Sequence, residues 1–186
     1  MSRRSEIKLA GVGGQGVVLA GTIIGCAASV YDHINAVQTK EYGSELRGGD
    51  VSTGVIVSDE KIIFPSVISP DVLIVLAQQA FESTRHLLKP GATLLTDSDQ
   101  VQVDTATLPK GVTHIHAPFN AIADQEFHQN TVLNMITLGF FSAKTGIISM
   151  DALRQAVAML VPPKSKEQNL KAVERGIEWG GEPQCP

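Results

Sequence analysis

The sequence predicts a single α/β domain with three layers, α/β/α, built around a Rossmann-like sheet that is mixed but mainly parallel. A short apolar run at residues 7–10 is followed by a glycine-rich turn at residues 11–16. An apolar segment at residues 17–28 is then long enough for a buried helix. Apolar runs at residues 71–77 and 92–96 are typical of strands buried on both faces. With 186 residues, 43% of them apolar, the chain can bury one sizeable core.

The glycine-rich turn has the spacing G-x-G-x-x-G at Gly11, Gly13 and Gly16. We expect Gly11 and Gly13 to permit a tight turn at positive φ, and Gly16 to let the helix begin close to the strand. Free N–H groups and the helix dipole then attract anions to this corner.

Three interpretations of the turn remain open: NAD or FAD binding, packing of helix on strand alone, or contact with a phosphate group or a partner protein. The first requires an acidic residue at the end of the second strand, about 20 residues further on. That strand is expected at residues 35–39. Asp32 precedes it and Glu41 follows it, so the match is poor.

Alternating β-branched residues predict a strand at residues 51–57, and residues 61–64 are expected to return beside it as a hairpin partner. A helix at residues 80–88 follows the central strand. Short edge strands are expected at residues 100–105 and 113–117.

Residues from about 120 onward have a helical pattern. Asn130 and Asn134 are four residues apart, so we expect them on one face of a helix. They either serve a polar function, or act as an N-cap and a hydrogen-bonded core residue. Ser149 is expected to cap the next helix. The domain is expected to span residues 5–178, and residues 179–186 to form a flexible tail.

A polar, glycine-rich segment at residues 41–50 separates two expected strands. In open α/β sheets, loops after the carboxyl ends of strands form the binding crevice, so we expect Glu41, Glu45 and Arg47 near the glycine-rich turn. The two glycines after Arg47 let a ligand or partner backbone approach closely. The alternative is a solvated loop in which Arg47 pairs with a local carboxylate.

Composition and motifs argue against several functions. The formal charge is −4 without a long basic run, so nucleic acid is not expected as a partner. Cys26 and Cys185 are too few for a four-ligand iron–sulfur or zinc site, and no metal site is expected. Neither a signal peptide nor a membrane-length apolar run is visible, so we expect a cytoplasmic protein away from membranes. Without a nucleophile motif, the chain is not expected to be active alone.

Two motifs together identify a family. Residues 11–16 (GVGGQG) and 42–49 (YGSELRGG), with NAVQT at residues 35–39, resemble the gamma subunit of 2-oxoacid:ferredoxin (flavodoxin) oxidoreductases. The resemblance covers roughly residues 5–178. One departure is DVSTGV at residues 50–55, where relatives often have small and basic residues.

The resemblance implies a complex that oxidatively decarboxylates a 2-oxoacid to an acyl-CoA and reduces ferredoxin. Thiamine diphosphate, iron–sulfur clusters and coenzyme A are its implied cofactors, with the first two on other subunits and none bound by this chain alone. The implied partners are those other subunits and, through them, ferredoxin; a homodimer is left open. The 2-oxoglutarate members look most similar, and branched-chain and indolepyruvate members stay open.

Two competing interpretations are a stand-alone NAD- or FAD-binding protein and a purely structural scaffold subunit. No catalytic residue and no metal ligand is assigned to the chain. The candidate ligand- or partner-binding residues are Gly11, Gly13, Gly14, Gln15, Gly16, Glu41, Tyr42, Glu45, Arg47, Gly48, Gly49, Asn130 and Asn134.

Overall fold

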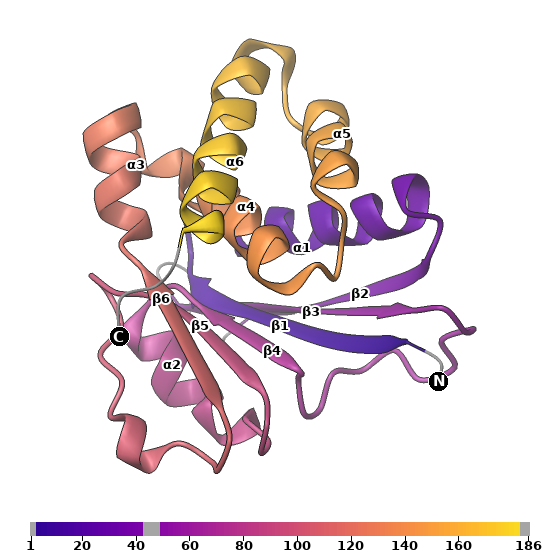
Figure 1. The fold of residues 1–186 in the computed structure, drawn as a ribbon, viewed down its shortest axis with the longest axis vertical. Helices are drawn as coiled ribbons and strands as arrows, with labels where there is room; N and C mark the ends of the chain where they lie inside the picture. Colours follow the sequence, from indigo (N-terminus) through magenta and orange to yellow (C-terminus); the bar gives the residue numbers. More distant parts are fainter. Residues whose placement is uncertain (1–2, 43–48, 183–186) are drawn as a thin grey trace.

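One sheet runs through the protein, which we describe from a computed structural model covering residues 3–42 and 49–182. The strands of this described part are β1 (Arg4–Val12), β2 (Asn35–Tyr42), β3 (Asp50–Ser58), β4 (Val72–Val75), β5 (Thr93–Asp97) and β6 (Thr113–Ala117). They lie side by side in the order β2-β3-β1-β4-β5-β6 (Figure 1).

The sheet is mixed but mainly parallel, as predicted. β1, β4, β5 and β6 form three parallel pairs, whereas β3 runs antiparallel to both of its neighbours, β1 and β2. Therefore β3 is the one reversed strand among those described. All four residues of β4 are buried, in agreement with its continuous apolar run.

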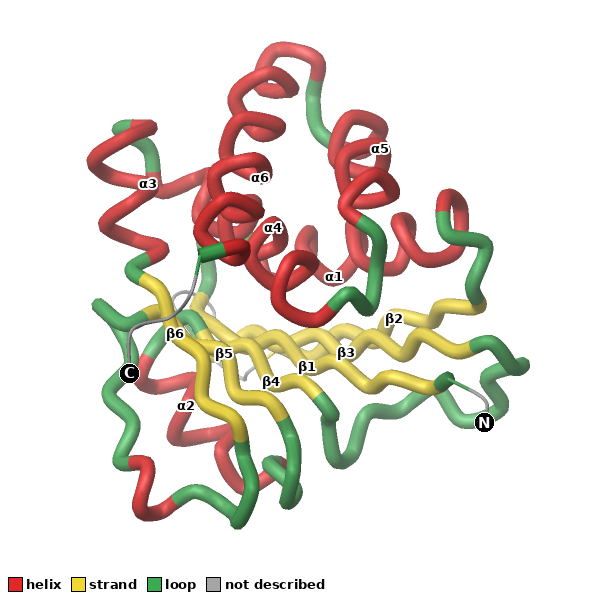
Figure 2. Tube along the Cα trace, in the orientation of Figure 1, coloured by secondary structure: helices red, strands yellow, loops and turns green. Residues whose placement is uncertain are grey.

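Helices cover the two faces of the sheet unequally. The described helices are α1 (Val17–Cys26), α2 (Gln78–Thr84), α3 (Phe119–Phe127), α4 (Leu133–Thr145), α5 (Met150–Leu160) and α6 (Lys166–Gly181), with shorter turns η1 (Ala27–Tyr31), η2 (Arg85–Leu87), η3 (Thr105–Thr107), η4 (Asn130–Val132) and η5 (Pro163–Ser165). Figure 2 shows α2 on one face and the other five helices on the opposite face. The predicted three-layer α/β/α architecture is confirmed.

Strand alternation divides the apolar side chains between two cores. On β1, Ile7 and Leu9 face the larger core, which the sheet forms with α1, α4, α5 and α6. Ala10 faces the smaller core against α2. Lys8 also points to the α2 side and is only 3% exposed, so this buried face of β1 carries one charged group.

Two expected strands are wrong. Residues 61–64 form no strand, because β3 already pairs with β2 on one side and β1 on the other, which leaves no edge for a hairpin partner. Residues 100–105 also form no strand. There the N–H groups of Gln100 and Val101 both donate to the carbonyl of Asp97, which turns the chain away from the sheet.

The flexible tail was expected to begin at residue 179, which is too early. α6 continues to Gly181, and Trp179 packs against the larger core, so residues 179–181 are helical. Residues 183–186 lie outside the described part. No described helix combines the length and apolar character needed to cross a bilayer.

Glycines allow α4 and α6 to cross at very short range. A Cβ atom on Gly139 of α4 would overlap the carbonyl oxygen of Val173. A Cβ atom on Gly176 of α6 would overlap the carbonyl oxygen of Ile136. Because both obstacles are backbone atoms, no rotamer change can relieve them, and the two helices depend on glycine at this crossing.

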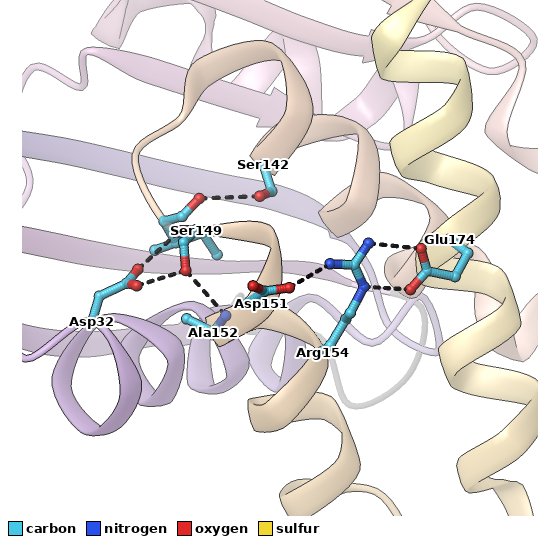
Figure 3. A network of polar contacts seen from close by, with 8 residues as sticks. Asp32, Ser142, Ser149, Asp151, Ala152, Arg154 and Glu174 are labelled. Atoms are coloured by element: carbon cyan, nitrogen blue, oxygen red, sulfur yellow. Dashed lines mark hydrogen bonds and ion pairs between the residues drawn. The ribbon is translucent and has the colours of Figure 1, made fainter.

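Polar contacts fix the start of α5 and join it to α6 (Figure 3). Ser149 caps α5, as predicted: its Oγ accepts from the N–H of Ala152 at 3.1 Å and donates to Asp32 Oδ1 at 2.7 Å. Arg154 donates to both carboxylate oxygens of Glu174, at 2.6 and 2.9 Å, and to Asp151 at 2.7 Å. These contacts hold α6 to α5, which in turn packs against α1, the helix after the glycine-rich turn.

Candidate binding site at the glycine-rich turn

The glycine-rich turn connects β1 to α1 at the carboxyl edge of the sheet. Gly14 has φ +103° and Gly16 has φ +71°, so these two positions require glycine. Gly11 and Gly13 were expected at positive φ, and that expectation is wrong because Gly11 still lies in β1 and neither residue is among those at positive φ. The residues with left-handed backbone conformation therefore lie in the second half of the turn.

Gln15 fastens the turn to the sheet. Its Oε1 accepts from the N–H of Val12 at 2.8 Å, and its Nε2 donates to the carbonyl of Leu76 at 2.9 Å. Gly11 leaves room for this side chain, since a Cβ there would lie 2.5 Å from Gln15 Oε1. Gln15 and Gly11 thus position the turn from within the chain.

The N-terminus of α1 opens onto a cavity of about 440 Å³. Its walls include Gly13, Gly14, Gly16, Leu19 and Val51. Gly16 is the N-cap residue, so α1 has no side-chain cap, and its first turn carries no acidic residue. The first N–H groups of a helix have no carbonyl partner inside it, and the helix dipole adds positive potential. This arrangement favours an anionic group or a carbonyl oxygen from a partner.

Asn134 lies against the turn from α4. Its side chain is 3% exposed, its Nδ2 donates to the carbonyl of Gly16 at 3.2 Å, and its Oδ1 is buried without a partner among the described residues. The expectation that Asn130 shares a helix face with it is wrong. Asn130 is the first residue of the 3-10 turn η4, whereas Asn134 lies in α4, which begins at Leu133, so the two do not belong to one α-helix.

Gly49, the last residue of the second motif, lies beside the glycine-rich turn. The N–H of Gly13 donates to the carbonyl of Gly49 at 3.3 Å. Tyr42 is the last residue of β2. Glu45, Arg47 and Gly48 lie outside the described residues, and their predicted roles rest on the sequence.

Glu41 does not lie beside the glycine-rich turn. We expected it beside the glycine-rich turn, but its Oε2 accepts from Lys8 Nζ at 2.6 Å and from Ser52 Oγ at 3.2 Å, on the α2 side of the sheet. Strand alternation explains the difference, because Glu41 and Lys8 point to the face opposite α1. The Lys8 ammonium lowers the pKa of the Glu41 carboxyl below its usual range.

Lys8 and Glu41 line a second cavity, of about 390 Å³. Asp50, Ser52 and His86 also line it, and Asp50 Oδ1 is buried without a partner among the described residues. Lys8 was not among the residues predicted for a site, although a lysine within the apolar run of a buried strand is a sequence signal for a buried charge. In the described part of the chain, no group of three or more His, Cys, Asp or Glu residues could hold a metal ion.

Replacing Glu41 by alanine is expected to cost more stability at pH 7 than replacing Lys8 by methionine. Glu41→Ala leaves a buried ammonium without its counter-charge, at a cost of roughly 1–3 kcal/mol. Lys8→Met keeps the side-chain volume and leaves a carboxylate that water can reach, at a cost below about 1 kcal/mol. Urea unfolding of the two variants measures the difference, and the reverse order would contradict the assignment of the buried charge.

The same pair gives a pH dependence. Since the pKa of Glu41 is lower in the folded chain than in the unfolded one, the pair stabilises fully above the unfolded pKa. This contribution is lost as the pH falls through the folded pKa. The stability advantage of the wild type over Glu41→Gln should therefore shrink from about pH 5 downwards.

Comparisons with known proteins agree with one another. The family model described as pyruvate ferredoxin/flavodoxin oxidoreductase matches residues 6–179. The KorC subunit of 2-oxoglutarate synthase from Methanocaldococcus jannaschii is 43% identical over 176 residues, covering 94% of this chain and 93% of that protein.

Two further relatives show this domain alone and as part of a longer protein. The crystal structure of the gamma subunit of a keto/oxoacid ferredoxin oxidoreductase from Geobacter sulfurreducens has a TM-score of 0.81 and 37% identity, covering 95% of this chain and 98% of that one. The VorA subunit of ketoisovalerate oxidoreductase from Methanothermobacter thermautotrophicus is 33% identical, over 95% of this chain but only 36% of its own length.

Proposed function

Because the chain belongs to the pyruvate ferredoxin/flavodoxin oxidoreductase family, we propose that it is the gamma subunit of a 2-oxoacid:ferredoxin oxidoreductase whose substrate is 2-oxoglutarate. The observation that carries this proposal is the 43% identity to a 2-oxoglutarate synthase subunit across nearly all of both chains. The complex converts the 2-oxoacid to an acyl-CoA and passes the electrons to ferredoxin.

The chain's own contribution in this proposal is binding and orientation. Thiamine diphosphate supplies the carbanion chemistry, and it resides with the iron–sulfur clusters on other subunits. The donor set described here supports that division, because Cys26 is partly buried next to apolar residues and burial raises the pKa of its thiol. Such a thiol is a poor cluster ligand.

The cavity at the glycine-rich turn is the proposed contact to an anionic group, such as a phosphate of coenzyme A, or to a partner subunit. Two features support it: the uncapped N-terminus of α1 and the left-handed glycines Gly14 and Gly16. Gly11 and Gln15 then position the turn without binding the ligand themselves.

Residues 42–49 extend this site in the proposal. Gly49 lies against Gly13, which supports a position for the whole motif beside the turn. Arg47 stays a sequence-based prediction: its guanidinium is suited to a carboxylate or phosphate. Tyr42, Glu45 and Gly48 belong to the same sequence motif and stay predictions as well. A cytoplasmic location and a homodimer of the isolated chain also stay predictions from the sequence.

Purification of the tagged chain from its native host tests the proposal against its rivals. The expected result is a multi-subunit complex that reduces ferredoxin with 2-oxoglutarate and coenzyme A, and less rapidly with 2-oxoisovalerate or pyruvate. A chain that purifies alone with a flavin spectrum, or that is stabilised by micromolar NADH, would instead support a stand-alone dinucleotide-binding protein.

A further inference from the structure

The connection between β3 and β4, residues 59–71, exposes three large apolar side chains within six residues. Ile63 is 90% exposed, Ile68 63% and Phe64 59%. In the rest of the described chain, only Met159 of α5 exposes a large apolar side chain to a comparable degree, at 62%. A group of exposed apolar side chains beside polar neighbours is typical of a surface that another protein covers.

The connection is anchored on the sheet. Val67 is 9% exposed, and its Cγ2 atom lies 3.0 Å from where a Cβ on Gly54 of β3 would be. α2 packs against β1, β4 and β5, and this connection lies on the same face of the sheet, beside β3 (Figure 1). Because Val67 and the buried Pro70 fill the inward positions, Ile63, Phe64 and Ile68 stay at the surface.

The free edge of the sheet lies next to the start of this connection, at Lys61 and Ile62. β2 pairs only with β3, so its other edge is unpaired in the described part of the chain. A hollow of about 480 Å³ lies there, lined by Ile34, Asn35 and Val37 on one side and by Lys61 and Ile62 on the other. An unpaired edge strand presents backbone N–H and C=O groups to a neighbouring chain.

We infer that Ile63, Phe64 and Ile68, with the adjoining edge of β2, form the docking surface for another subunit of the complex; this rests on the proposed function. The occupant is the counterpart of the polypeptide that accompanies this domain in VorA. The match occupies 36% of VorA, so the larger part of that chain lies outside it. A domain joined covalently to its neighbour in one relative requires a non-covalent contact when it is a separate subunit.

The partner presents apolar side chains to Ile63, Phe64 and Ile68 and an extended segment to β2. Apolar anchors near the centre of an interface carry most of its binding energy, so the two adjacent side chains of Ile63 and Phe64 are the test positions. Met159→Ser is the matched control, because Met159 is equally exposed but lies on α5, across the sheet.

The chain is co-expressed with the other subunits of its complex as wild type, as Ile63→Ser/Phe64→Ser, as Ile63→Lys, and as Met159→Ser. Co-purification, ferredoxin reduction with 2-oxoglutarate, and the Tm and mass of each isolated chain are measured. We expect both surface variants to keep the wild-type Tm and to lose co-purification at least tenfold, while Met159→Ser behaves as wild type.

Different outcomes would contradict the docking surface and the proposed function. Surface variants that assemble and turn over like the wild type overturn the inference alone. Surface variants that only convert a wild-type homodimer to a monomer, with the complex intact, also overturn it and assign the surface to self-association. A wild-type chain that does not assemble with the other subunits contradicts both the proposed function and the inference.

Discussion

Replacing Gly176 by alanine is expected to destabilise the isolated chain by about 3 kcal/mol or more. The added Cβ would overlap the carbonyl oxygen of Ile136, a backbone atom of α4 that cannot rotate away. Relief requires α4 and α6 to move apart, which would open the larger core around buried residues such as Phe140. Gly139→Ala is expected to have a similar effect, since its Cβ would overlap the carbonyl oxygen of Val173.

The matched control lies on the same helix. Gly181 has no atom within 4 Å of its Cβ position, so Gly181→Ala is expected to change stability by less than about 1 kcal/mol. Urea unfolding followed by circular dichroism measures all three variants. If Gly176→Ala proved as stable as Gly181→Ala, the close crossing of α4 and α6 would be wrong.

The second large effect is expected at Gly16. Alanine there meets two obstacles: the φ of +71°, which costs about 1–3 kcal/mol for a residue with a Cβ, and overlap with the amide of Asn134. Movement of either residue would break the hydrogen bond from Asn134 Nδ2 to the Gly16 carbonyl and displace the N-terminus of α1. We therefore expect lower stability of the chain and at least tenfold lower activity of the assembled complex.

A double-mutant cycle separates the two obstacles. Gly14→Ala places a Cβ at φ +103° with no atom within 4 Å, so it measures backbone strain without the overlap. Asn134→Ala removes the obstructing amide, and Gly16→Ala should then cost roughly 1–3 kcal/mol less than it does in the wild type. An unchanged cost in the Asn134→Ala background would show that Asn134 does not contact the turn as described.

Local sequence patterns predicted most of this fold for a physical reason. A strand buried on both faces, such as β4, is recognisable from a few consecutive apolar residues. The glycine-rich connection from β1 to α1 is likewise recognisable from consecutive residues. The cap at Ser149 is similarly local. Each of these features depends on the backbone within one element, so a window of the sequence contains the necessary information.

The errors came from contacts between distant segments. Residues 61–64 have strand-forming composition, but β1 and β2 already occupy both edges of β3. Nor did the sequence indicate that Gln15 donates to the carbonyl of Leu76, 61 residues away. Glu41 was placed beside the turn, and its partner is Lys8 on the opposite face, 33 residues away. Such pairings depend on strand order, which no short window specifies.

Some features of the candidate site could also be placed from the sequence. The sequence placed residues 11–16 and 42–49 together at the carboxyl edge, and the contact between Gly13 and Gly49 agrees with this. Asn134 was singled out because asparagine is unusual in an apolar helix, and it does lie against Gly16. Asn130 had the same residue type, but it lies in the turn η4 before α4 and not in α4 itself.

The central claim is that this chain is a required subunit of a 2-oxoacid:ferredoxin oxidoreductase. The most direct test is reconstitution of the complex from separately purified subunits, with ferredoxin reduction measured in the presence of 2-oxoglutarate and coenzyme A. We expect no turnover from the other subunits alone or from this chain alone, and full activity when the chain is added at stoichiometric amounts. Full activity of the other subunits without this chain would contradict the account.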